Sequence, residues 1–100
     1  MFFITCFQKI STDSFGWLDM GTYRTFGFTK TFEDARFYLN KNHYDMRECL
    51  YDYAVVEEMN EGIHPDVVNR WFFKFDEDKG GFYQISEPKE FIGYTNISIG

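Results

Sequence analysis

Two arginines of this chain lie beside aromatic side chains, a combination that can hold a phosphate group and a flat ring together. Arg24 stands two residues before Phe26, and Arg70 directly precedes Trp71. A guanidinium donates paired hydrogen bonds to phosphate oxygens, and a neighbouring ring stacks on a nucleobase. With Tyr83 as a further ring, these residues are the candidate site for a small nucleotide-like ligand. The alternative is that each arginine pairs with a nearby carboxylate of this acidic protein.

Two clusters of carboxylates suggest a different function, the inhibition of a basic partner protein. The chain holds 16 acidic and 10 basic residues, a formal charge of −6. Acidic clusters steer association with basic surfaces, although most are only solvated surface. The same charge repels phosphate backbones and anionic lipids, so we expect neither bulk nucleic-acid binding nor membrane binding. The candidate partner-binding residues are Glu57, Glu58, Glu61, Asp76, Glu77 and Asp78.

The sequence carries no recognisable catalytic or metal-binding pattern. Neither His43 nor His64 has a Ser or Cys placed for nucleophilic catalysis. No Cys/His spacing predicts a zinc site, and we expect Cys6 and Cys49 to be reduced, buried thiols. We therefore expect a protein that is not an enzyme and that needs no metal or cofactor.

One segment, Asp76–Glu87, partly matches a calcium-binding loop. It has acidic residues at loop positions 1, 3 and 12 and a glycine at position 6. Position 8, which is normally aliphatic, is Tyr83, and Pro88 opposes the helix that should follow. Alternating aromatic residues on both sides of a Gly-Gly turn are typical of a β-hairpin, so the hairpin is the favoured interpretation.

The elements that must position these residues form a single α+β domain over residues 1–100. Thr31 is a helix cap followed by acidic residues and an apolar stripe, which predicts one main helix. Gly27, in the strand that precedes this helix, indicates either a bulge or a close approach of another backbone, and residues 11–21 indicate a loop. We expect a mostly antiparallel sheet of about six strands in the order ββαββββ, with the helix packed on one face. The expected strands are 2–10, 23–30, 51–59, 70–75, 82–86 and 91–99.

Aromatic residues make up 22% of the chain. One helix cannot cover six strands, so the opposite face of the sheet must curl on itself or meet another chain. Phe3, Phe7 and Phe72 point away from the expected helix, so a monomer would expose them. A second copy could cover these rings through a twofold interface, so we expect a homo-oligomer. The chain opens without a signal-like segment and has no apolar run of about 20 residues, so we expect a cytoplasmic protein.

Several segments distributed over nearly the whole chain carry a resemblance to known sequences. They are Arg24–Phe28, Phe32–Ala35, Tyr53–Glu58, Glu61–Pro65, Trp71 and Ser98–Gly100. In these segments the sequence resembles a family of small uncharacterised proteins of bacteria and their phages. That family has no assigned activity, so the resemblance transfers no site residue. It implies phage counter-defence as a context, in which such proteins bind a host protein or sequester an immune nucleotide signal.

Overall fold

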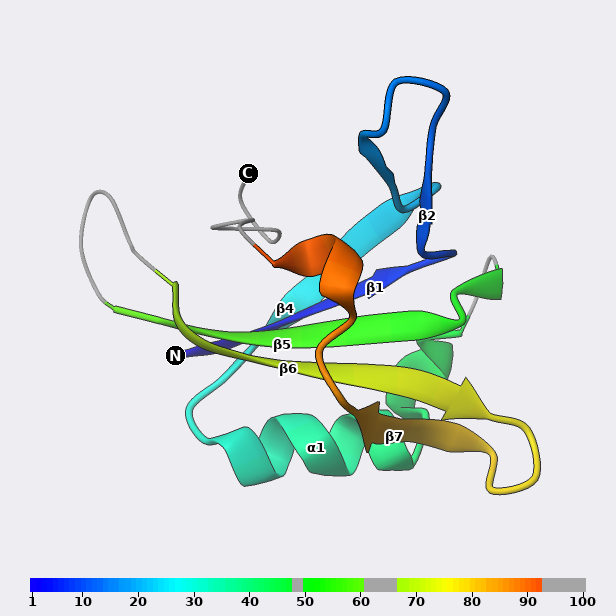
Figure 1. Ribbon diagram of the computed structural model, residues 1–100. Coiled ribbons are helices and arrows are strands. Elements are labelled where there is room, and N and C mark those ends of the chain that lie inside the picture. Colours follow the sequence, from blue (N-terminus) through cyan, green and yellow to red (C-terminus); the bar gives the residue numbers. More distant parts are fainter. Residues whose placement is uncertain (48–49, 61–66, 93–100) are drawn as a thin grey trace.

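A five-stranded antiparallel sheet with one α-helix beneath it forms the body of the protein (Figure 1). The computed structural model describes residues 1–47, 50–60 and 67–92. Across the sheet the strands are β4 (Tyr23–Thr29), β1 (Phe2–Phe7), β5 (Tyr53–Met59), β6 (Val67–Asp76) and β7 (Gly81–Ile85). The smaller elements are the hairpin of β2 (Ser11–Thr12) and β3 (Leu18–Asp19) and the 3-10 helices η1 (His43–Asp45) and η3 (Lys89–Phe91).

The predicted α+β class, the antiparallel sheet and the single main helix are confirmed. The order is ββββαβββ, because residues 11–21, predicted as a loop, contain the β2–β3 hairpin. The predicted last strand begins wrongly, since Phe91 belongs to η3, and the rest of it lies outside the described residues. Within the described ranges, no helix is long and apolar enough to cross a membrane.

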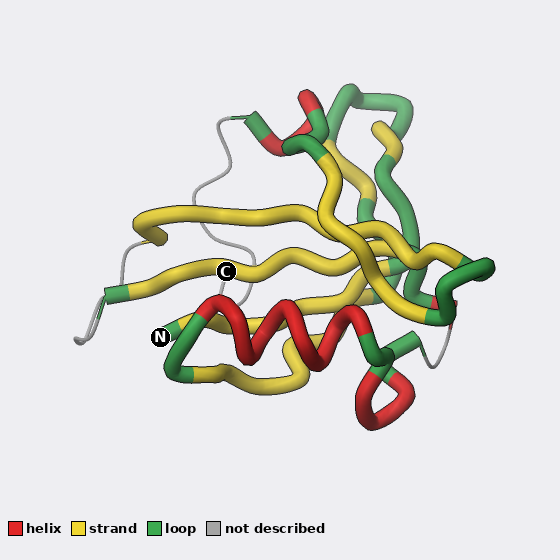
Figure 2. The backbone as a smooth tube through the Cα atoms, turned by 90° about the horizontal axis from the view of Figure 1, so that it is seen from below, coloured by secondary structure: helices red, strands yellow, loops and turns green. Residues whose placement is uncertain are grey.

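The helix α1 (Phe32–Asn40) begins where the sequence predicts it. The Thr31 side chain accepts a hydrogen bond from the Asp34 N–H at 3.2 Å, and Glu33 and Asp34 fill the first turn. These groups satisfy the free N–H groups and the positive end of the helix dipole. Ala35 and Leu39, four residues apart, are fully buried against the sheet. Figure 2, seen from below, shows α1 running in roughly the same direction as the strands.

The face of the sheet that α1 covers holds the first core. Ile4 and Cys6 alternate with residues of the other face along β1, as strand geometry requires. At the amino-terminal end of the helix, the rings of Phe32 and Trp71 pack with centroids 4.6 Å apart. The buried members are Ile4, Cys6, Ala35, Leu39, Met46, Tyr51, Ala54, Val56, Phe73 and Phe82.

The opposite face, which the sequence analysis expects to curl on itself or to meet another chain, carries a second core. Phe7 and Phe72, expected to be exposed in a monomer, are buried beneath Phe91 of η3. The Phe91 ring centroid lies 4.8 Å from that of Phe72 and 5.5 Å from that of Phe7. Phe3 is half-buried and packs against Phe28 at 5.5 Å. One chain therefore covers most of the surface on which the prediction of an oligomer rested, while the oligomeric state itself stays a prediction.

The β6–β7 hairpin predicted between residues 70 and 86 is confirmed. Asp76 Oδ1 accepts hydrogen bonds from the N–H groups of Asp78 and Lys79, and Gly80 adopts a φ of 72°. These hydrogen bonds and the Gly80 conformation form the turn between β6 and β7. Residues 72–75, which would form the first helix of a calcium-binding helix-loop-helix, lie in β6.

Candidate functional site

The five residues predicted to bind a ligand lie on both faces of the sheet. Arg24 pairs with Cys6, whose side chain belongs to the core beneath α1. Arg70 pairs with Glu57, which lies two residues after Val55 of the second core. Residues two apart on a strand share a face, so Arg70 lies on the face of the sheet opposite to α1. The structure thus separates the two arginines that the sequence analysis placed in one site.

Trp71 and Tyr83, the two predicted aromatic residues that lie outside β4, are also far from Arg24. Trp71 is packed in the first core against Phe32 and Phe2. Tyr83 lies in β7, which forms the edge of the sheet opposite to β4. The Lys79 Nζ lies over the Tyr83 ring, 4.5 Å from its centroid. Of the predicted set, the structure brings together only Arg24 and Phe26.

A β-bulge in β4 places Phe26. Ile4 pairs with Gly27 and Thr5 pairs with Thr25, so Phe26 is an extra residue in the ladder. Gly27 has a φ of 147°, a conformation that side chains with a Cβ rarely adopt. A bulge rotates the side chain of its extra residue relative to the regular pleat, and bulges often occur next to functional sites. The bulge that Gly27 indicated in the sequence is thus confirmed.

An open apolar hollow lies beside this bulge, with a volume of about 240 Å³. Its walls come from β4, β1, α1 and the residue that follows η1. Phe26 and Tyr38 are its aromatic walls on the side of the sheet that α1 covers, whereas the Phe28 ring packs against Phe3 on the other face. Typical small-molecule pockets begin at about 300 Å³, so this hollow fits a single ring system better than a whole nucleotide. The lining residues are Ile4, Phe26, Gly27, Phe28, Thr29, Tyr38 and Met46.

Arg24 supplies a positive charge next to this hollow. Its guanidinium carbon lies 5.0 Å from the centroid of the Phe26 ring, and the residue is exposed. Among the described residues Arg24 forms no ion pair, whereas Arg36, Arg47 and Arg70 each pair with a carboxylate. The Arg24 guanidinium is therefore positioned to bind an anionic group.

Arg70, in contrast, holds part of the fold together. One of its amino groups donates to Glu87 Oε1 and to the Phe91 carbonyl oxygen, both at 3.2 Å. These bonds fix η3 over the second core, and Arg70 itself pairs across the strands with the buried Glu57. The pairing with a carboxylate that the sequence analysis kept as an alternative is thus observed for Arg70.

The predicted acidic clusters lie at opposite ends of the β5–β6 pair, and several of their carboxylates already have protein partners. Glu57 is fully buried, and Glu58 accepts a hydrogen bond from Asn69 Nδ2 at 3.0 Å. Asp76 closes the β6–β7 turn, and Glu77 pairs with Arg47 at 2.8 Å. Asp78 is exposed, and Glu61 lies outside the described residues.

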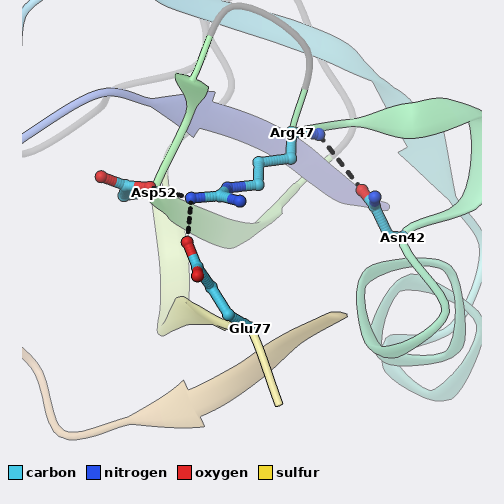
Figure 3. Close-up of polar contacts among 4 residues, drawn as sticks. All are labelled: Asn42, Arg47, Asp52 and Glu77. Carbon is cyan, nitrogen blue, oxygen red and sulfur yellow. Dashed lines mark hydrogen bonds and ion pairs between the residues drawn. The ribbon is translucent and has the colours of Figure 1, made fainter. Parts of the chain in front are cut away.

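Arg47 forms a polar cluster that the sequence analysis did not single out (Figure 3). One amino group contacts Asp52 at 3.2 Å and Glu77 at 2.8 Å, and the Arg47 N–H donates to Asn42 Oδ1 at 3.1 Å. The hydrogen bond that Arg47 donates to Asp52 is the main cause that raises the pKa of Arg47. The guanidinium also lies 4.2 Å from the centroid of the Phe75 ring. These contacts hold the segment that places Met46 in the wall of the hollow; because the partners are distant in sequence, no local pattern indicates them.

No group of three or more His, Cys, Asp and Glu side chains lies close enough to hold a metal ion in the part of the chain that the structure describes. Comparison with known protein families, curated proteins and solved structures finds no match to this chain.

Proposed function

We propose that this protein is a non-catalytic, cytoplasmic binding protein for a small flat ligand that carries an anionic group. The supporting observation is the apolar hollow beside the bulge of β4, where Arg24, without an ion-pair partner among the described residues, lies over the Phe26 ring. Aromatic walls bind flat rings, and an adjacent guanidinium binds phosphate or carboxylate. A nucleotide-like molecule has both features.

The dimensions of the hollow define how such a ligand would bind. A volume of about 240 Å³ accommodates a nucleobase but not the sugar and phosphate as well. The base would enter between Phe26 and Tyr38, and the phosphate would stay at the surface, near Arg24. We therefore expect nucleoside monophosphates and cyclic nucleotides to bind better than nucleosides, which lack the anionic group.

Calorimetric titration with a panel of nucleotides, cyclic nucleotides and the matching nucleosides tests this proposal. Loss of a charged hydrogen bond costs about 1.5–3 kcal/mol, so Arg24→Ala should weaken nucleotide binding about tenfold or more. The matched control is Arg36→Ala, which removes an exposed arginine on α1 that pairs with Glu33. Phe26→Leu keeps an apolar side chain while removing the ring, and should also weaken binding.

Two results would contradict the proposal. One is that no member of the panel changes the heat signal or the melting temperature of the wild-type protein. The other is that a nucleotide binds equally well to the wild type and to the Arg24→Ala variant, which would place the ligand elsewhere.

A further inference from the structure

The β2–β3 hairpin exposes two large aromatic side chains at its tip. Phe15 is 84% exposed and Trp17 is 67% exposed, the highest fraction for any Phe and any Trp of the described residues. We call residues 11–19 the finger. In Figure 1 the finger rises from the sheet on the side opposite to α1. A soluble protein gains nothing in stability from rings held in water, so such exposed rings often mark an interaction site.

The tip of the finger has a defined backbone. Asp13 Oδ1 accepts hydrogen bonds from the N–H groups of Phe15 at 2.8 Å and Trp17 at 3.0 Å. The Asp13 N–H donates to the Trp17 carbonyl oxygen at 2.9 Å, and the Gly16 N–H donates to the Asp13 carbonyl oxygen at 3.0 Å. Gly16 has a φ of 82°, which turns the chain between the two rings. The tip therefore loses little conformational entropy when a partner binds.

The base of the finger is anchored to the body of the protein. Leu18 and Met20 pack against the second core. The N–H groups of Gln8 and Lys9 both donate to the Met20 carbonyl oxygen at 3.1 Å, and Lys9 Nζ contacts Asp19 at 3.1 Å. The N–H of Gly21, and next the Lys9 side chain, lower the pKa of Asp19, which keeps this pair charged. Apolar side chains are therefore packed against the core at the base of the finger and exposed at its tip.

Charge indicates the chemistry of the partner. Residues 11–23 contain Asp13 and Asp19 but no Lys or Arg, and Lys9 already pairs with Asp19. Among the described residues, Asp13 forms no ion pair, so the tip carries a net negative charge beside its rings. The whole chain has a formal charge of −6. A second copy of the chain and an anionic membrane would both be repelled by these charges.

We propose that the finger docks into an apolar cavity of a partner protein whose rim carries Lys or Arg side chains. Phe15 and Trp17 are the anchors, and Asp13 contacts the basic rim. Aromatic anchors seated in a pocket contribute most of the affinity of many protein interfaces. The hollow beside β4 lies on the side of the sheet that α1 covers, so the finger could act whether or not a small ligand is bound there.

The experiment compares what the wild type and its variants retain from a lysate of cells that carry this sequence. The variants are Phe15→Ser, Trp17→Ser and Asp13→Asn, and the matched control is Phe37→Ser, which removes a 51% exposed ring from α1. Proteins that the wild type retains but the Phe15→Ser and Trp17→Ser variants do not are identified by mass spectrometry. Each is then purified and titrated against every variant. Circular dichroism and urea unfolding verify that each variant is folded.

We expect a purified basic protein that binds the wild type and the Phe37→Ser variant equally. Its affinity for Phe15→Ser and Trp17→Ser should fall about tenfold or more. Asp13→Asn keeps the oxygen that orders the tip but removes the charge, so affinity should fall a few-fold and depend less on salt.

Several outcomes would overturn the proposal. One is that Phe15→Ser and Trp17→Ser retain the same proteins from the lysate as the wild type. Another is that the partner is acidic and binds with an affinity that does not change with salt concentration. Self-association that Trp17→Ser abolishes, seen by sedimentation velocity, would make a second copy the occupant. Cosedimentation with phosphatidylcholine or phosphatidylglycerol vesicles that depends on Trp17 would make a membrane the target.

Discussion

Gly80 and Gly81 are neighbours that are glycines for different physical reasons. A Cβ on Gly81 would lie 1.9 Å from the Asn40 carbonyl oxygen, because β7 passes directly against the end of α1. A Cβ on Gly80 would meet no atom within 4 Å, but its φ of 72° is unfavourable for other residues. The first glycine is required by packing, and the second by backbone conformation.

We predict that Gly81→Ala lowers the free energy of unfolding by about 3 kcal/mol or more, because backbone must move to relieve the clash. Gly80→Ala should cost only about 1 kcal/mol, the usual penalty for a left-handed residue with a side chain. Urea denaturation followed by circular dichroism measures both. Equal costs for the two variants would show that β7 does not approach α1 this closely.

Cys6 is a fully buried thiol, and burial raises its pKa from 9.0 to about 12. At pH 8 the thiolate fraction is then about 1000-fold smaller than for an exposed cysteine. In a Cys49→Ser background, we predict almost no reaction of Cys6 with a chromogenic thiol reagent until urea unfolds the protein. Rapid labelling of the folded protein would contradict this expectation.

The same shift has a consequence at alkaline pH. Above pH 9 the unfolded chain loses the Cys6 proton while the folded protein keeps it, so the folded state binds more protons and the free energy of unfolding falls. The contribution of Cys6 is fully present below pH 9 and is lost progressively between pH 9 and 12. Compared with Cys6→Ala, the wild type should lose stability more steeply over this range. Parallel stability profiles for the two proteins would argue against the shift.

The helix α1 depends on its amino-terminal cap. Thr31 Oγ1 accepts the Asp34 N–H, which otherwise has no partner within the helix. We predict that Thr31→Ala lowers the free energy of unfolding by about 1 kcal/mol, while Thr31→Ser, which keeps the acceptor, has a much smaller effect. Chemical denaturation measures both variants, and equal loss for the two would mean that the hydroxyl does not act as a cap.

Elements with a clear repeat could be predicted from the sequence, and elements without one could not. The cap and spacing of α1, the alternation in β6 and β7 and the glycine of the β4 bulge each leave a local pattern. β2, β3 and η3 are each only two or three residues long, too short to show a repeat. They form because Leu18, Met20 and Phe91 pack in the second core. Long-range packing therefore decides these elements, and local preference does not.

The same limit applies to the candidate site. Arg24 and Phe26 were predicted together because they are close in sequence, and the structure keeps them close. Arg70 was added for its aromatic neighbours, but the register of β5 and β6 directs it to the other face. Strand register depends on contacts between segments that are far apart in the chain, so no local reading separates the two arginines.

At the scale of the whole molecule, one sheet is shared by two cores, and η3 covers the second. Phe91 is fully buried between Phe7 and Phe72, and Arg70 holds its backbone. We predict that Phe91→Ala lowers the free energy of unfolding by about 3–5 kcal/mol, the usual cost of truncating a buried Phe. The rings uncovered by this change should also increase self-association, which light scattering can measure relative to the wild type. A variant as stable and as dispersed as the wild type would show that η3 is dispensable.

The position of β1 inside the sheet affects how the protein is made. β1 is synthesised before both of its neighbours in the sheet, and Ile4 pairs on one side with Gly27 and on the other with Val56, 52 residues later. At about 5–20 residues per second, a ribosome takes roughly 3–10 s to produce those residues. During that interval β4 can pair with β1, but the other edge of β1 remains open, with Phe2 and Phe3 beside it. We therefore expect newly made chains to be most prone to aggregate in this interval and to benefit from chaperones that bind exposed strands.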